Sequence, residues 1–433
     1  MCRPPPQPLP ESPHSNGSKG EPLVGIEGAK PPGGVRGGAP LAHHPLDPLC
    51  GPVPHDRNVP RNLSWQPGDA TPVRVLVWQW GRFGGGPRFA VMLADGLRVS
   101  PGVTPILSLS RRADVLKGPT PPACALLVDT YNGMVGFAFR VLIAPWLYWR
   151  LVPTLRALAP DLAICAHPGP LDLIMAYALR RIGVPLVVIV HDADPHPGDG
   201  LPFLMALQRR LCRMADGVAA FTSHVGDRLG QQGLTGPNGA RLIRIFMPPW
   251  PFGAPPPRPT DGPLRLLFFG RLLPYKGMDL LTEALDALGP RDDVVLRVVG
   301  SGPESPDLAR LRDRPGVTVE NRWVPETELG EVLGWAHALI LPYREASQSG
   351  VAAAGLAAGC AIIATAVGGL AEQLEGQPNV TLCPPDAAAI AGAIDAMARQ
   401  RPPASGTAVD IDAAWRDMAA LLLRQARALT GKA

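Results

Sequence analysis

Short apolar and β-branched runs alternate along the chain with segments in which apolar residues recur at helical spacing. In the first half, the runs that predict buried strands are residues 73–77, 126–128, 162–165, 185–190 and 218–221. In the second half they are residues 264–269, 294–299, 317–319, 338–341 and 361–364, separated by helical stretches such as 278–288 and 326–335. This alternation is typical of parallel sheets covered by helices on both faces. The pattern therefore predicts an α/β chain with two Rossmann-like parallel-sheet domains.

Composition marks the boundaries between these regions. Residues 1–70 are dominated by Pro, Gly, Ser and His and lack apolar periodicity, which predicts a disordered leader. Residues 248–263 are Pro-rich and predict a semi-rigid linker between a first domain at 71–247 and a second at 264–405. In the remaining segment, 406–433, Trp415, Met418 and Leu422 share one helical face. We expect this helix to pack back across the junction of the two domains.

Charge and cysteine content narrow the class of protein. The 433 residues carry 41 basic and 37 acidic side chains, a net charge of +4, and no basic block indicates binding to nucleic acid. The seven cysteines are scattered, without metal-type pairs, and residues 1–9 do not form a secretory signal. These features predict a soluble protein of the cytoplasm.

An aromatic segment at residues 137–152 raises the question of membrane contact. Arg140 and Arg150 flank its apolar residues and Pro145 interrupts it, so the uncharged run is too short to cross a bilayer. Two interpretations stay open. The segment either rests on the inner face of a membrane, where Trp and Tyr are favoured, or forms an ordinary core helix with a loop.

The most informative segment for chemistry is residues 268–277, at a predicted junction between a strand and a helix. Arg271 and Lys276 lie five positions apart there. Both cations can reach one diphosphate on such a loop, and the N-terminus of the helix adds a partial positive charge. The segment predicts a phosphate clamp; the alternative is a pair of solvated loop charges.

A second segment, residues 342–351, also follows a predicted buried strand. Ser349 and Gly350 fall where a helix begins, so their backbone N–H groups and the hydroxyl are available to an anion. Alone, the pattern is equally consistent with a plain N-terminal serine cap. Together with the first segment it favours phosphate binding.

These motifs resemble the donor half of the family-4 (group 1) retaining glycosyltransferases of the GT-B fold. The matching residues are Gly270-Arg271-x4-Lys276-Gly277, Gly300-Ser301-Gly302-Pro303, residues 343–350, and Gly359-x5-Thr365-x2-Gly368-Gly369-x2-Glu372. The resemblance is specific over residues 264–372 and weaker over 73–248. It implies that Arg271 and Lys276 hold the donor diphosphate, that Ser349 and Gly350 bind its distal phosphate, and that Glu372 lines the same pocket.

The sequence departs from the family at one pair of positions. The family usually carries two glutamates eight residues apart, and these positions read here as Ala346 and Ala354, with Glu345 beside the first. The second glutamate normally contacts the nucleotide ribose, so the resemblance leaves donor identity open. Some members similar in this segment carry Ser-Gln-Ser-Gly without the second glutamate, which keeps activity among the expectations.

The first domain offers two further candidates. The Gly-rich turn at residues 80–87 follows a strand, and we expect Gly85 and Gly86 to face the cleft and approach the donor. His191 ends the strand at 185–190, where open α/β sheets place ligands. The resemblance implies that His191 lies near the transferred sugar as a hydrogen-bonding or electrostatic group, without acting as a nucleophile.

A metal site is the alternative interpretation of this strand end, since His191, Asp192, Asp194 and His196 are ligand types that suit zinc or manganese. The cationic clamp already neutralises a diphosphate, so we expect no metal and no cofactor beyond the nucleotide-sugar donor.

The sequence thus predicts a retaining glycosyltransferase that moves a hexose-type sugar from a nucleoside diphosphate to a sugar or lipid-linked acceptor, in cell-surface polysaccharide or glycolipid assembly. Two other functions stay open. One is a non-catalytic nucleotide-sugar-binding scaffold, and the other is a GT-B-like sugar epimerase. The fold alone does not separate the three.

Overall fold

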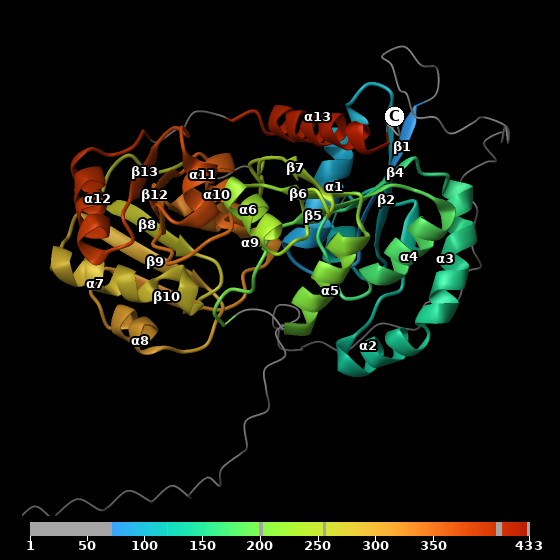
Figure 1. Cartoon of the computed structure of the whole chain (residues 1–433). Coiled ribbons are helices and arrows are strands. Elements are labelled where there is room, and N and C mark those ends of the chain that lie inside the picture. The colour runs from blue at the N-terminus through green and yellow to red at the C-terminus, as the bar shows by residue number, and fades with distance from the viewer. Residues whose placement is uncertain (1–71, 119, 199–201, 254–256, 404–408, 431–433) are drawn as a thin grey trace, which may run out of the picture.

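The computed structural model describes residues 72–118, 120–198, 202–253, 257–403 and 409–430. The predicted leader at residues 1–70 lies outside them. Within them the chain forms two parallel sheets, each covered by helices, side by side (Figure 1).

The first sheet has seven parallel strands in the order β3-β2-β1-β4-β5-β6-β7. The strands are β1 (Val73–Gln79), β2 (Val103–Ser110), β3 (Leu126–Val128), β4 (Leu162–Cys165), β5 (Leu186–Val190), β6 (Gly217–Ala220) and β7 (Arg241–Arg244). The helices are α1 (Gly85–Arg98), α2 (Gly133–Leu142), α3 (Ala144–Leu158), α4 (Asp172–Ile182), α5 (Pro202–Met214) and α6 (Ser223–Gln231), with a 3₁₀ turn at Asp114–Leu116. Every residue of β5 is buried, as expected of a central strand covered on both faces.

The second sheet has six parallel strands in the order β10-β9-β8-β11-β12-β13. They are β8 (Leu264–Phe269), β9 (Val294–Gly300), β10 (Val317–Asn321), β11 (Ala338–Leu341), β12 (Ala361–Thr365) and β13 (Val380–Cys383). The helices are α7 (Met278–Leu288), α8 (Pro306–Arg312), α9 (Glu326–Trp335), α10 (Gly350–Ala357), α11 (Gly368–Leu374) and α12 (Ala387–Arg399), and a 3₁₀ turn spans Pro274–Lys276. The expected α/β class with two parallel sheets is confirmed.

The helix α13 (Ile411–Thr430) follows the second sheet in sequence but packs on the first domain, against α1 and β7 (Figure 1). Trp415 buries its ring 5.2 Å from that of Phe89 on α1, and its indole N–H donates to Pro249 O at 2.9 Å. Gln425 donates to the carbonyl of Arg244 and accepts from its N–H. The first core is therefore built from two distant parts of the chain.

The Pro-rich stretch between the sheets is in contact with both of them. Trp250 donates its backbone N–H to Ala353 O at 3.1 Å in the second domain, while its ring lies 6.2 Å from Phe89 in the first. Arg88 of α1 donates to Pro251 O and pairs with Glu326 of α9. These contacts anchor the linker at the junction.

Among the described helices, none has by itself the length and apolarity needed to cross a membrane. The pair α2 and α3 meets those criteria together, but the two helices meet at a bend of 69°.

Candidate functional site

The conformation of the loop that follows β8 is constrained by a second loop that packs closely against it. Gly277 has a φ of +70°, and a Cβ atom at this position would lie 1.8 Å from Pro342 O, just after β11. The backbone N–H of Arg344 donates to Tyr275 O at 2.9 Å. The two segments that the sequence singled out are therefore pressed together, with glycine allowing the contact.

Lys276 is buried where these loops meet. Its Nζ lies 3.7 Å from the centroid of the Tyr343 ring and 4.9 Å from that of Tyr275. Arg271 donates to the Tyr275 hydroxyl at 2.9 Å and is itself exposed. Aromatic faces attract cations, so the two tyrosines bring both cationic groups into one cluster.

The start of α10 joins the same cluster. Ser349 caps this helix by accepting from Ala352 N at 3.2 Å, and its Oγ lies 3.5 Å from the Tyr343 hydroxyl. Burial raises the pKa of Tyr343 well above its usual value, so the hydroxyl keeps its proton. The Gln373 side chain accepts from Ser349 N at 2.7 Å and donates to Ser349 O at 3.0 Å, which fixes the turn. A Cβ added at Gly350 would meet no atom within 4 Å, so the helix N-terminus borders open space.

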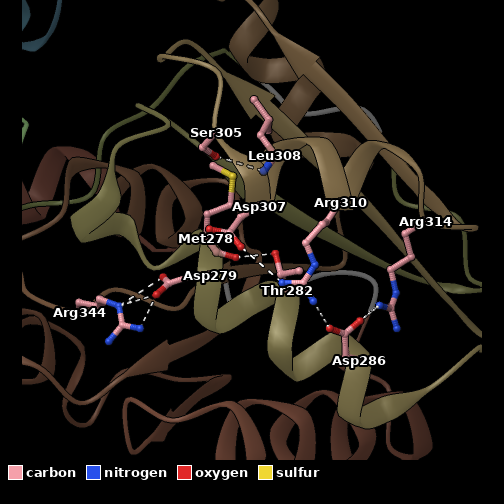
Figure 2. Close-up of polar contacts among 10 residues, drawn as sticks. All are labelled: Met278, Asp279, Thr282, Asp286, Ser305, Asp307, Leu308, Arg310, Arg314 and Arg344. Atoms are coloured by element: carbon pink, nitrogen blue, oxygen red, sulfur yellow. Dashed lines mark hydrogen bonds and ion pairs between the residues drawn. The ribbon is translucent and has the colours of Figure 1, made fainter.

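A polar network joins α7 to the segment around α8 and to the loop after β11 (Figure 2). Arg344 binds Asp279 in the first turn of α7, with Nε 2.9 Å from Oδ2. Burial works to raise the pKa of Asp279, but the hydrogen bond and charge of Arg344, together with hydrogen bonds from the backbone, outweigh it and lower the pKa below its usual value. Asp286, two turns along, accepts from Arg310 and Arg314 at 2.5 Å each. The β11 loop is thus tied to the same helix that begins at the clamp.

His191 follows β5 and is buried among rings. It lies 5.2 Å from Phe89, 4.9 Å from Phe221 and 4.4 Å from His167 between ring centroids. Its Nε2 is 3.1 Å from Ala166 O, so this nitrogen carries the proton and donates. Burial, and then the neighbouring His167, lower the pKa of His191 to about 3. The imidazole is neutral at physiological pH.

His196 connects this strand end to the clamp. Its Nε2 lies 3.1 Å from Asp192 Oδ1, its Nδ1 lies 2.9 Å from Glu345 Oε1 of the second domain, and its ring stacks on Tyr275 at 4.5 Å. Burial works to lower the pKa of His196, yet the carboxylates of Asp192 and Glu345 outweigh it and raise the pKa above 6.5. Burial likewise works to raise the pKa of Asp192, but the hydrogen bond from His196 and the neighbouring histidines bring it to about 2. His196 thus bridges the domains, and the two carboxylates favour its charged form.

Glu372 lies at a different contact between the domains. Both carboxylate oxygens accept from the backbone N–H of Ser223, at 2.7 Å, at the start of α6 in the first domain. Beside it, Thr222 Oγ1 donates to Ser347 O at 3.1 Å. Glu372 therefore stabilises a helix start, and its expected contact with the donor stays a prediction.

Gly85 and Gly86 begin α1, and their lack of side chains has a local packing reason. A Cβ on Gly85 would lie 2.9 Å from the Trp250 ring, and one on Gly86 would lie 2.8 Å from the Gln79 side chain. The structure thus accounts for both glycines through packing at the end of β1. Their approach to the donor stays a prediction.

The metal interpretation of the β5 end has little geometric support. No group of three or more His, Cys, Asp or Glu among the described residues is arranged to hold an ion. Asp194 pairs with Arg228 and accepts from Gln232 at 2.9 Å, while Asp192 accepts from His196.

The structure therefore brings Arg271, Lys276, Ser349 and Gly350 into one cluster, and it links the His191 strand end to that cluster through His196. Tyr275, Tyr343 and Gln373 complete the cluster but were not singled out from the sequence. The available sequence signal for the two tyrosines was their position inside the segments at 268–277 and 342–351.

The two positions where the family usually has glutamate hold buried alanines. Ala346 and Ala354 are 4% and 2% exposed, and neither side chain carries a carboxylate. Glu345 is directed to His196 instead.

Models of two known families match the chain, one over each domain. The model described as Glycosyltransferase Family 4 matches residues 83–242, and the model described as Glycosyl transferases group 1 matches residues 263–400. The two matches follow each other along the chain and cover most of both sheets.

Individual relatives agree with these models. A glycogen synthase of Mycobacterium tuberculosis is 29% identical over 307 residues, which cover 65% of this chain and 72% of the relative. A D-inositol 3-phosphate glycosyltransferase of Frankia alni is 34% identical over 154 residues, 32% of this chain and 38% of the relative.

Solved structures share the fold. Anabaena HepE, in complex with UDP and glucose, has a TM-score of 0.58 at 17% identity and covers 83% of this chain and 99% of its own. The sucrose-phosphate synthase of Thermosynechococcus elongatus has a TM-score of 0.56, also at 17% identity, and covers 82% of this chain and 96% of its own. With one family model on each of two facing parallel-sheet domains, the chain belongs to the group 1 glycosyltransferases of family 4 and has their GT-B fold.

Proposed function

We propose that the chain transfers a hexosyl group from a nucleoside diphosphate sugar to an acceptor, with retention at the anomeric carbon. The observation that carries the proposal is the cluster in which Lys276, Arg271 and the N-terminus of α10 meet over Tyr343 and Tyr275. Two cations and a helix N-terminus held on one side of two adjoining loops suit a diphosphate. Retention follows from the family-4 resemblance.

The chemistry of transfer explains why such a cluster is useful. When the nucleoside diphosphate leaves, negative charge develops on the phosphate oxygens while the sugar becomes cation-like. Lys276 and Arg271 stabilise the leaving group. Neutral His191 offers hydrogen bonding at the sugar side without placing a second positive charge beside the cation-like carbon.

The donor to test first is UDP-glucose. HepE has been solved with UDP and with UDP-glucose, and a glycogen synthase is among the relatives of the chain. We assign the reaction to cell-surface polysaccharide or glycolipid assembly. We also propose a cytoplasmic location, which the free state of the described cysteines supports: Cys124, Cys165, Cys212, Cys360 and Cys383.

Thermal unfolding of the full chain with UDP, GDP, ADP and dTDP tests donor binding. A nucleotide at about a hundredfold over its dissociation constant adds roughly 2.7 kcal/mol to the stability of the bound protein. We expect one nucleotide to raise the unfolding temperature, and Lys276→Ala to abolish the rise. Lys117→Ala, which removes an exposed lysine in the first domain, is the matched control.

The same two variants test transfer. Loss of one cation at a partly buried phosphate contact lowers the rate by about a hundredfold. Lys276→Ala should show this loss, and Lys117→Ala should retain the parent rate. Parental transfer by Lys276→Ala would refute the clamp.

A second candidate is a nucleotide-sugar binder without activity, which the buried Ala354 in place of the usual glutamate favours. Binding of UDP with neither transfer nor hydrolysis of UDP-glucose, across a panel of sugar and lipid-linked acceptors, would support this function instead.

A further inference from the structure

An apolar groove of about 850 Å³ opens on the first domain between α2, α3, α4 and α5. The residues that line it include Phe137, Ala144, Tyr148, Leu171, Ile174 and Phe203. None of the residues that line it belongs to the clamp cluster, and the proposed sugar substrates are polar. Its lining suits a hydrocarbon chain.

The outer surface beside the groove is also apolar. On α2 and α3, Val135 is 85% exposed, Leu142 77%, Trp149 70% and Trp146 52%. In Figure 1, α3 lies at the side of the first domain that faces away from the second domain, and α2 lies at the lower end of the first domain. Exposed apolar side chains on two successive helices, with tryptophans among them, are typical of a surface that meets a partner or a membrane.

Charge identifies the kind of partner. The helices α2, α3 and α5 carry arginines and no acidic residue, although acidic and basic residues are nearly balanced over the whole chain. Arg180 and Arg181, in the last turn of α4, line the groove, and Arg150 lies 5.0 Å from the Trp146 ring. An apolar patch with a cationic rim is complementary to an anionic lipid surface.

Helix geometry indicates how the patch meets a bilayer. Together α2 and α3 have the length and apolarity of a membrane span, but the bend of 69° between them prevents a straight crossing. Trp146 and Trp149 on α3 suit the headgroup region. The pair is therefore suited to lying along the surface.

One loop links the groove to the predicted sugar site. Pro170 and Leu171 line it and belong to the loop between β4 and α4. His167, at the beginning of that loop, packs on His191 with 4.4 Å between ring centroids. A chain in the groove would thus bring its headgroup toward the strand ends of the first sheet.

We infer that this groove binds the hydrocarbon chain of an anionic membrane lipid while α2 and α3 lie on the bilayer surface. That this lipid carries the acceptor sugar or hydroxyl rests on the proposed function. The binding itself does not, because it depends only on the groove and the surface beside it.

Sedimentation of the full chain with vesicles tests the surface. We expect binding to phosphatidylcholine vesicles that contain phosphatidylglycerol, and weak binding to phosphatidylcholine alone. The double variant Trp146→Ser/Trp149→Ser should weaken binding to the anionic vesicles by about tenfold, since removing interfacial apolar area lowers membrane affinity. Equal binding of parent and variant, or equal binding to both vesicle types, would overturn the inference.

A dansyl-labelled undecanoic acid tests the groove, because its fluorescence rises and shifts to the blue in an apolar site. Ala144→Trp fills the groove, whereas Ala157→Trp places the same side chain on an exposed position of α3 outside the groove. We expect saturable probe binding to the parent and to Ala157→Trp, and at least a tenfold weaker affinity in Ala144→Trp. Unchanged binding to Ala144→Trp would refute the groove as the site.

Nucleotide binding separates this inference from the proposed function. Each variant is also heated with and without UDP. A parental unfolding temperature and a parental UDP shift in Ala144→Trp, combined with loss of the probe, establish a local effect on the groove. Lipid and probe binding without any nucleotide shift would sustain the groove while refuting the donor site, and the reverse result would refute the groove alone.

Discussion

Two buried basic side chains, Lys276 in the second domain and His191 in the first, both lie among aromatic rings but in different electrostatic surroundings. The Lys276 ammonium sits over the face of Tyr343, at 3.7 Å from its centroid. His191 meets Phe89 at an interplanar angle of 82°, and burial together with His167 lowers its pKa to about 3. One cluster thus favours a cation, and the other holds a neutral ring.

This difference matches the two ends of a nucleotide sugar. The diphosphate is anionic and gains from a cation held against a ring face. The sugar carbon becomes positively charged during transfer, so a neutral hydrogen-bonding group is better placed beside it than a protonated one. The contrast shows that burial among rings does not by itself determine charge, because ring orientation and neighbouring groups decide it.

The largest effect is expected from placing a cation in the His191 cluster. In His191→Lys an ammonium is buried among rings, while the nearby Asp192 carboxylate is already bound to His196, and we expect a cost of about 3 kcal/mol or more. His191→Gln retains a neutral donor toward Ala166 O and should cost about 1 kcal/mol. Urea-induced unfolding measures both. If His191→Lys has the stability of the parent, the contrast between the two clusters is wrong.

A smaller loss is expected on the Lys276 side, where the loop depends on Gly277. Gly277→Ala adds a Cβ that would lie 1.8 Å from Pro342 O in a backbone conformation with a φ of +70°. We expect a loss of about 2 to 3 kcal/mol and weaker nucleotide binding. Gly289 has the same φ but open space around it, so Gly289→Ala should cost only about 1 kcal/mol and leave binding unchanged. Equal losses in thermal unfolding would show that the loop contact is unimportant.

Variants of Glu372 test whether this residue only supports the start of α6 or also contacts the donor. As a cap of α6, its replacement in Glu372→Ala should lower stability by about 1 kcal/mol, and Glu372→Gln, which retains one acceptor, should lose less. A titration with UDP-glucose separates the two roles of Glu372, because a purely structural role leaves the affinity of both variants at the parental value. A marked fall in affinity in Glu372→Gln, without loss of stability, would instead support the contact with the donor that the family resemblance implies.

The smallest effect concerns His196, which joins the two clusters. Because the pKa of His196 is raised in the folded state, its stabilising contribution is complete below about pH 6.5, the unfolded value, and disappears as the pH rises through the folded pKa. Glu345 is half exposed, so the contribution should stay below about 1 kcal/mol. Thermal unfolding between pH 5 and pH 9 should reveal this decline in the parent, and His196→Gln should remove it. A parental pH profile in His196→Gln would exclude the bridge.

Sequence patterns predicted much of the fold because the buried strands and amphipathic helices carry strong local signals. The helices at 278–288 and 326–335 and the strand at 264–269 have the predicted bounds. Strands β2, β7 and β13 were not predicted. Thr104, Pro105 and Ser108 interrupt the apolar run in β2, and β7 and β13 are short edge strands with exposed residues.

The site was predicted less completely, for a physical reason. Charged residues on strand-to-helix loops indicate phosphate binding by their type and spacing, which is why the sequence singles out Arg271 and Lys276. The contact between Lys276 and the Tyr343 ring joins two loops that are far apart in sequence. The hydrogen bonds of Glu372 depend on where the first domain places the start of α6. Such contacts arise only when the sheets are placed together.

The return of α13 to the first domain has a consequence for synthesis of the protein. A chain grows from its N-terminus, and domains generally fold as they emerge. Here Trp415, Met418 and Leu422 complete a core that contains Phe89 and Leu93, so the first domain is finished only after the second has been made. A ribosome-bound chain that ends before residue 411 would hold the second domain whole and the first with an uncovered apolar surface on α1.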